Sequence, residues 1–164
     1  MKKNRFGQAK VLDTEELDLV IKYLPSKFHQ VLANTLRNTG ARVGEVIQLT
    51  WNDVEEESIL FPKEDWTLFK GRKPLPEDYI FYGRFNGSHI TSRAFFLALE
   101  KSLERAEIRG ATSHSFRRSQ LTKLHKSGLP LKIIQSLSGH SSLNTLSLYL
   151  QVDDEDKKRA NLTH

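Results

Sequence analysis

The sequence predicts a mainly α-helical domain that carries a small antiparallel β-sheet. Apolar residues recur at intervals of three and four over most of the chain, which is the spacing of amphipathic helices. Short runs typical of strands occur only between residues 58 and 82. The length of 164 residues suits a single domain with its own core, and the chain contains neither internal repeats nor low-complexity tracts.

Start and stop signals place the helices. Asp13 followed by Glu16 is typical of a helix N-terminus, and Pro25 should end this first helix, which we expect over residues 14–24. A second helix should end at Thr39, because Gly40 can supply the left-handed position after the last turn. Further helices are expected over residues 43–50, 92–108, 116–126, 131–137 and 143–150.

The small sheet is expected between the third and fourth of these helices. Residues 58–61 and 66–69 have strand composition and are separated by a turn-like segment that contains Pro62. Residues 79–82 predict a further strand. In the helix over 92–108, Phe95, Phe96, Leu99 and Leu103 are expected on one face.

Composition excludes several classes of chemistry. The chain has no cysteine, which excludes disulfides, thiolate zinc sites and cysteine nucleophiles, so that any nucleophile must be oxygen or nitrogen. No apolar run approaches the roughly 20 residues that cross a bilayer, and no apolar signal core follows the N-terminus, which predicts a cytosolic protein.

Basic residues are concentrated in one part of the chain. The formal net charge is +5, and residues 108–152 contain no Asp or Glu. A stretch without carboxylates suits a surface that faces phosphate, and it is equally typical of a solvated basic face. Its cations are Arg109, Arg117, Arg118, Lys123, Lys126 and Lys132, together with three histidines.

Several polar residues indicate a function only when their order along the chain is considered. Singly, Arg42 is typical of a surface cation, His140 of a helix cap and Tyr149 of a core aromatic residue. Together they form four motifs: Arg42 in Thr-Gly-Ala-Arg-Val-Gly-Glu, His114 and Arg117 in His-Ser-Phe-Arg, His140 in Leu-Ser-Gly-His-Ser-Ser, and Tyr149 nine residues later. In this order, residues 10–152 resemble the tyrosine recombinase (phage integrase) family.

The resemblance implies the catalytic-domain fold of DNA breaking-rejoining enzymes and a partner, duplex DNA, held in a C-shaped clamp with a second domain. It implies a site-specific recombinase or integrase that uses no metal, cofactor or ATP. Residues 1–10 are then a basic leader or linker remnant and 11–164 the catalytic domain, without the core-binding domain that usually precedes it. The tail after Tyr149 is implied as a surface for self-assembly on DNA.

The resemblance also assigns roles to residues. Arg42 and Arg117 would hold the scissile phosphate, because guanidinium groups match its geometry and keep their charge. Tyr149 would attack phosphorus to give a 3′-phosphotyrosine. His114 would act as base or hold the phosphate, and His140 would donate a hydrogen bond to it.

Further residues complete the implied site. A lysine on the sheet hairpin would protonate the leaving 5′-hydroxyl, and we place Lys70 ahead of Lys63 and Lys73. Glu45 would steady Arg42, although a solvated helix residue fits the same position. Contacts with DNA are expected from Arg118, Lys123, Lys126 and Lys132.

The sequence departs from the family pattern at three places. Gly44 stands where a small polar residue is usual, Arg118 where His is frequent, and only about ten residues separate Lys70 from the strand at Ile80. Two other functions fit the same motifs: DNA relaxation like that of a type IB topoisomerase, and DNA binding without catalysis.

Overall fold

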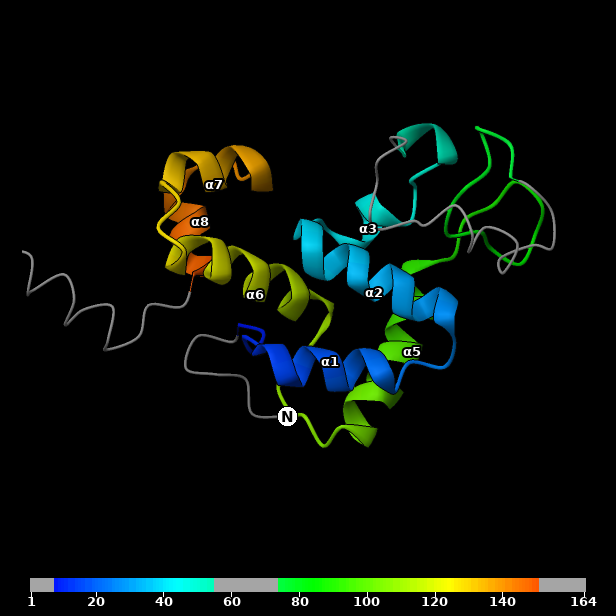
Figure 1. The fold of residues 1–164 in the computed structure, drawn as a ribbon, viewed down its shortest axis with the longest axis horizontal. Coiled ribbons are helices and arrows are strands. Elements are labelled where there is room, and N and C mark those ends of the chain that lie inside the picture. Colours follow the sequence, from blue (N-terminus) through cyan, green and yellow to red (C-terminus); the bar gives the residue numbers. More distant parts are fainter. Residues whose placement is uncertain (1–7, 55–73, 151–164) are drawn as a thin grey trace, which may run out of the picture. The chain divides into compact units, whose positions relative to one another are not determined.

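The computed structural model describes residues 8–54 and 74–150, and it divides the chain into two compact units. The first unit comprises Met1–Gln120 and the second Leu121–His164. The division falls within one helix, α6 (Ser113–Lys126). Figure 1 labels the elements. The strands expected over residues 58–61 and 66–69 lie outside the described residues.

Helices account for most of the first unit, as predicted. Its elements are α1 (Thr14–Lys22), α2 (Lys27–Thr39), α3 (Val43–Val46), the 3-10 turn η1 (Trp51–Asp53), α5 (Ser92–Arg105) and the first part of α6. The α1 helix contacts both α2 and α5, and α2 contacts α3 (Figure 1).

The N-terminus of α1 forms the predicted cap. The Asp13 carboxylate accepts a hydrogen bond from the Glu16 amide at 2.8 Å, and the Glu16 carboxylate accepts one from the Asp13 amide at 3.3 Å. The two bonds satisfy amides that have no partner within the helix. Glu16 also pairs with Lys10. The helix therefore begins where the sequence predicts and ends at Lys22, two residues earlier than expected.

The α3 helix is shorter than the predicted range of 43–50. It ends at Val46, because the following backbone pairs with a distant segment. The Leu49 carbonyl accepts a hydrogen bond from the Ile80 amide at 2.9 Å, and the Trp51 amide donates to the Asp78 carbonyl at 3.1 Å. These long-range bonds take the place of a further helical turn.

The predicted strand over residues 79–82 forms only two isolated antiparallel bridges, Thr50 with Tyr79 and Tyr82 with His89. Residues 8–54 and 74–150 contain no longer strand. Ile80 bonds to Leu49, whereas the Phe81 carbonyl accepts from the Ile90 amide at 2.7 Å. Because consecutive residues pair with different partners, no extended ladder forms.

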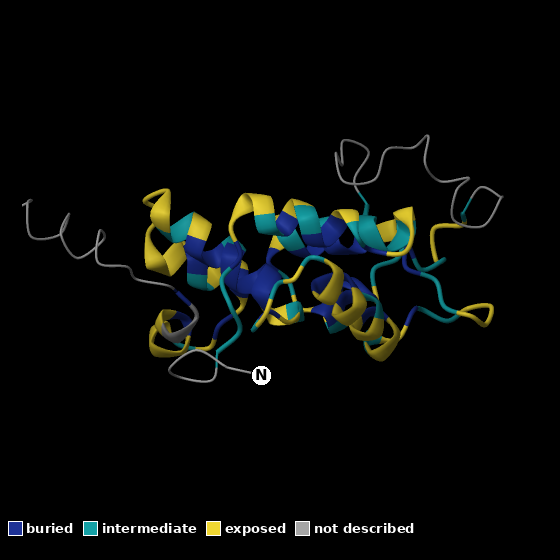
Figure 2. Cartoon of the chain, turned by 90° about the horizontal axis from the view of Figure 1, so that it is seen from below, coloured by how far each residue is buried: buried dark blue, intermediate teal, exposed yellow. Residues whose placement is uncertain are grey.

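The core of the first unit lies between α1, α2 and α5. Figure 2 shows its buried residues in dark blue on the inner sides of these helices. Phe95 and Leu99 belong to it, but Phe96 is 44% exposed, so the prediction that Phe96 shares their helix face was wrong. Neighbouring residues on a helix point about 100° apart, and burial of Phe95 turns Phe96 outward. The Ser102 hydroxyl donates to the Val20 carbonyl and joins α5 to α1.

The second unit has a small core of its own. It contains the end of α6, α7 (Leu131–Ser138) and α8 (Leu143–Tyr149), in close agreement with the predicted ranges. Pro130 precedes α7, and Gly139 ends it with φ of 63°. The buried apolar residues of this core are Leu121, Ile134, Leu146 and Leu150. Among the described residues of both units, no helix is long and apolar enough to cross a membrane.

Candidate functional site

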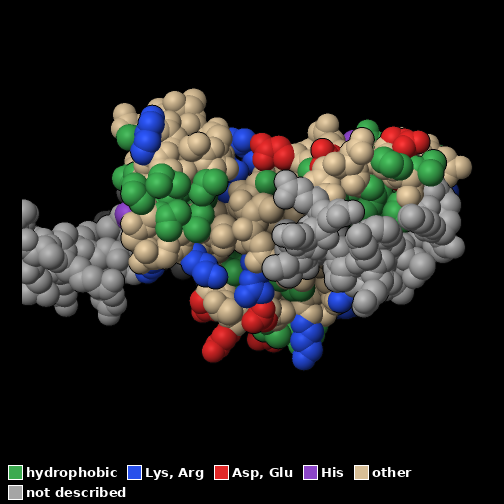
Figure 3. All heavy atoms as spheres, turned by 45° about the horizontal axis from the view of Figure 1, so that its top comes forward, with side chains coloured by type: hydrophobic (Ala, Val, Ile, Leu, Met, Phe, Trp, Pro, Cys, Tyr) green, Lys and Arg blue, Asp and Glu red, His purple; other side chains and the backbone are tan. Residues whose placement is uncertain are grey.

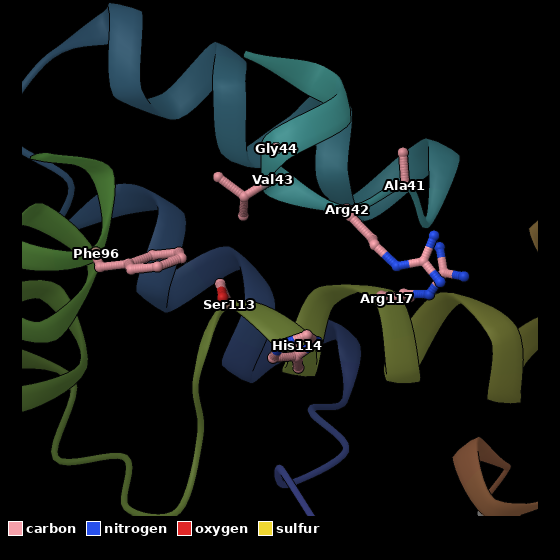
Figure 4. A pocket seen from close by; sticks show the side chains of 8 residues that line it. All are labelled: Ala41, Arg42, Val43, Gly44, Phe96, Ser113, His114 and Arg117. Carbon is pink, nitrogen blue, oxygen red and sulfur yellow. The ribbon is translucent and has the colours of Figure 1, made fainter. Parts of the chain in front are cut away.

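A pocket of about 130 Å³ in the first unit brings together three of the residues singled out from the sequence. Arg42, His114 and Arg117 all line it. Figure 4 shows the Arg42 and Arg117 guanidinium groups converging from two different elements, while His114 lies below them. The other lining residues are Ala41, Val43, Gly44, Phe96 and Ser113.

Arg42 reaches the pocket from the turn between α2 and α3. Gly40 follows α2 with φ of 65° and ψ of 14°, a conformation that glycine adopts without strain, and this reverses the chain just before Arg42. One oxygen of Glu45 accepts from the Arg42 amide at 2.7 Å and the other from its guanidinium at 2.8 Å. Glu45 thus fixes both the backbone and the side chain of Arg42.

Arg117 is held in a different way. Its side chain comes from α6 and is only 2% exposed. Its Nη1 donates to the Gly40 carbonyl at 2.7 Å. The residue that turns the chain toward Arg42 therefore also holds Arg117. Other bonds attach α6 to its surroundings in the first unit, among them those from Gln120 to the Asn38 carbonyl and from the Leu12 amide to Ser119.

The first turn of α6 positions His114. The Thr112 hydroxyl accepts from the His114 amide at 3.2 Å, and the Ser115 hydroxyl accepts from the Thr112 amide at 3.0 Å. This reciprocal cap begins the helix three residues earlier than the predicted range, so His114 and Arg117 lie one turn apart. Residues at this spacing share a helix face, which explains why both line the pocket.

Two guanidinium groups line the pocket, and the Glu45 carboxylate, which is not one of the lining residues, pairs with Arg42. Burial alone would raise the pKa of Glu45, but hydrogen bonds from Arg42 and the charges of Arg42 and Arg117 outweigh it and lower that pKa below the usual range. Glu45 is therefore ionised at neutral pH. The two arginines exceed its single negative charge, so the pocket favours an anion such as phosphate.

The other motif residues belong to the second unit. Ser138 contacts His140 through a hydrogen bond between Oγ and Nδ1 of 2.7 Å, and both residues are 7% exposed. Tyr149 is the last residue of α8, and its side chain is outside the described part of the structure. Lys70 and the two alternatives, Lys63 and Lys73, also lie outside the described residues.

The expected DNA contacts divide into two groups. Lys123, Lys126 and Lys132 are exposed in the second unit. Arg118 is 7% exposed, and its Nη1 donates to the Ala9 carbonyl at 2.5 Å, so the expectation that it contacts DNA does not fit its position. Burial also lowers the pKa of Arg118. In the face shown in Figure 3, basic side chains are interspersed with acidic ones.

Sequence reasoning missed several neighbours of the motif residues in the two units. Phe96 and Ser113 line the pocket, the Gly40 carbonyl holds Arg117, and Ser138 contacts His140. The sequence predicted that Gly40 ends a helix, but it did not predict the bond between Gly40 and Arg117, which are 77 positions apart. No local pattern reveals such a contact.

Comparison with known proteins finds the same family that the order of the motifs predicts. The sequence profile of the phage integrase family matches residues 62–156, more than half of the chain. The chain belongs to this family. Similar curated members include a tyrosine recombinase of Thermosipho africanus, 30% identical over 137 residues, and the tyrosine recombinase XerC of Chlamydia pneumoniae, 39% identical over 117 residues.

Solved structures share the fold of this integrase-family chain. The XerA recombinase matches with a TM-score of 0.77 at 18% identity, over 100% of this chain and 66% of that one. The XerH recombinase bound to its difH substrate matches with a TM-score of 0.70 at 22% identity, over 96% of this chain and 56% of that one. The mainly helical fold implied by the motifs is thereby confirmed, whereas the small sheet is not confirmed in the described residues.

The match to curated relatives is partial in length. The alignments include 72% of this chain with the Thermosipho africanus protein and 70% with the Chlamydia pneumoniae protein. They include 47% and 35% of those two proteins. The chain thus spans half or less of the length of these relatives.

Proposed function

We propose that this chain is the catalytic part of a site-specific recombinase or integrase, which cleaves and rejoins duplex DNA through a 3′-phosphotyrosine. The observation that carries the proposal is the pocket in which Arg42 and Arg117 converge beside His114. A pentacoordinate phosphorane carries more negative charge than the phosphodiester, and two fixed guanidinium groups stabilise that added charge. Membership of the phage integrase family supports the same chemistry.

The reaction has a balanced sequence of bond changes. The Tyr149 oxygen attacks phosphorus, the bond from phosphorus to the 5′-oxygen breaks, and the phosphate remains on the enzyme. His114 accepts the tyrosine proton or holds the phosphate, and His140 donates a hydrogen bond to it. Lys70, or else Lys63 or Lys73, supplies the proton of the leaving 5′-hydroxyl. Attack by another 5′-hydroxyl reverses these steps without ATP, because one phosphoester replaces another.

The proposal extends to partners and location. Duplex DNA is the substrate, and the exposed Lys123, Lys126 and Lys132 would contact its backbone. The tail over residues 151–164 would join protomers on DNA. The DNA of a bacterial nucleoid is the expected target, which places the protein in the cytoplasm.

Covalent capture tests the proposed function. The chain is incubated with a pool of duplexes that carry a nick within randomised sequence, so that the released fragment diffuses away and traps the intermediate. We expect a protein–DNA adduct on a denaturing gel, lost in Arg42→Ala and Arg117→Ala. Protection of DNA without any adduct would contradict catalysis and favour a DNA-binding relative. Relaxation of a supercoiled plasmid without strand exchange would favour the topoisomerase-like function.

A further inference from the structure

We infer that Ser138 is a positioning residue, whose hydroxyl orients the His140 imidazole and keeps its proton on Nε2. The inference deepens the proposed function, in which His140 donates a hydrogen bond to the scissile phosphate. It depends on contacts within the second unit alone.

The end of α7 brings the two side chains together. Gly139 adopts φ of 63° and ψ of 28°, which ends the helix and turns the chain back toward its last turn. The Gln135 side chain donates to the His140 carbonyl at 3.0 Å and fastens the backbone in that position. Ser138 and His140 are both buried. The imidazole is thus held close to the hydroxyl before any DNA binds.

Among the described residues, two acceptors lie within reach of the single Ser138 hydroxyl proton. Its Oγ lies 2.7 Å from Nδ1 of His140 and 3.3 Å from the Gln135 carbonyl. A carbonyl only accepts, so a hydroxyl that donates to Gln135 cannot also donate to His140. O–H···O hydrogen bonds are most often about 2.7 to 2.8 Å long, whereas N–H···O bonds are most often about 2.9 to 3.0 Å long. The short distance therefore favours donation from Ser138 to Nδ1.

This direction decides what the other ring nitrogen can do. A neutral imidazole carries one proton, and an Nδ1 that accepts from Ser138 leaves that proton on Nε2. Nε2 is then a donor at neutral pH, without protonation of the ring. With the opposite tautomer, Nε2 would present a lone pair that repels a phosphate oxygen. Ser138 would thus convert neutral His140 into a phosphate donor.

Ring nitrogen NMR tests the tautomer directly. The ¹⁵N-labelled chain is recorded without DNA at about pH 8, where an ordinary histidine is neutral, and His140 is identified by the signals lost in His140→Gln. We expect the proton of His140 on Nε2 alone. A proton on Nδ1, or a mixture of both tautomers, would overturn the inference.

A matched pair of variants tests the role of the hydroxyl. Ser138→Ala removes it, whereas Ser136→Ala removes an exposed hydroxyl from the same helix. We expect the Nδ1 resonance to shift only in Ser138→Ala, and covalent capture to slow by about tenfold in that variant alone. An Nδ1 resonance unchanged in Ser138→Ala would contradict the inference. Because the spectra need no DNA, a wild-type chain without any adduct would count against the proposed function instead.

Discussion

Arg42 and Arg117 line the same pocket, but they differ in solvent exposure and in the groups that hold them. Arg42 has a side chain that is 49% exposed and held by an ion pair with Glu45. Arg117 is almost fully buried and donates to a backbone carbonyl. Because the Arg117 guanidinium has little access to water, replacing it by a more flexible charged side chain should cost free energy. We therefore expect the two positions to differ in their tolerance of substitution.

The first prediction concerns Arg117→Lys, which keeps the positive charge. A lysine ammonium lacks the planar fork that serves the Gly40 carbonyl and a phosphate together, so capture should slow by at least about a hundredfold. Arg93→Lys, at an exposed position of α5, is the control and should leave capture unchanged. Equal capture rates in the wild type and Arg117→Lys would show that the guanidinium geometry is not needed.

The second prediction concerns the acid sensitivity of the fold. Burial lowers the pKa of His29, so the unfolded chain takes up this proton more readily than the folded one. Stability should be unaffected above the ordinary histidine pKa of about 6.5 and fall as the pH drops below it. Urea unfolding at about pH 7.5 and pH 5.5 measures the change. The loss of stability between these two pH values should be smaller in His29→Asn than in the wild type. An equal loss in both proteins would show that His29 does not contribute to the acid sensitivity.

At the level of elements, the ends of helices position the site. Gly40 ends α2, turns the chain toward Arg42 and offers its carbonyl to Arg117. The cap formed by Thr112 and Ser115 begins α6 and sets His114 one turn before Arg117. Both helix ends are formed by glycine or by short polar residues, which commonly cap helices in proteins. The motif residues therefore depend on caps that lie next to them in sequence.

The third prediction compares two neighbouring glycines. Gly40 has positive φ, so Gly40→Ala should lower the free energy of unfolding by about 1 kcal/mol or more. Gly44 lies within α3, and an added Cβ would meet no atom within 4 Å. Gly44→Ala should thus leave stability unchanged or raise it by up to about 1 kcal/mol. Urea unfolding of both variants checks the contrast, and equal losses would contradict the role of the left-handed turn.

Helix positions were largely predictable, because periodicity and caps are local. Asp13 and Gly40 marked their helix ends correctly. The end of α3 and the exposure of Phe96 were not predictable, since the first depends on the bond from the Ile80 amide to the Leu49 carbonyl and the second on how α5 packs. The prediction of a strand over residues 79–82 was wrong for a related reason, because these residues pair with different partners.

At the level of the whole molecule, the order of the motifs predicted the candidate site better than any single residue did. Arg42, His114 and Arg117 were named from the sequence, and they line one pocket. Arg118 was assigned to DNA from its charge alone, yet it bonds to Ala9 inside the first unit. Charge in a sequence does not reveal burial, so the basic stretch over residues 108–152 contains both structural and exposed cations.

The fourth prediction separates these two kinds of cation. Replacing Lys123, Lys126 and Lys132 together by Gln should weaken DNA binding and reduce the slope of log affinity against log salt by at most about 2.7. Arg118→Gln should instead destabilise the first unit, with little change in that slope. Titrations between about 50 and 200 mM salt provide the comparison. An unchanged slope in the triple variant would show that these lysines do not face DNA.

The central claim is that one tyrosine oxygen carries the broken DNA strand, and the most direct measurement is to locate the adduct. The chain has four tyrosines, so peptide mass spectrometry of the captured complex can distinguish every candidate. We predict the nucleotide on Tyr149, its loss in Tyr149→Phe, and its persistence in the Phe variants of Tyr23, Tyr79 and Tyr82. An adduct on another residue, or one that survives in Tyr149→Phe, would contradict the account.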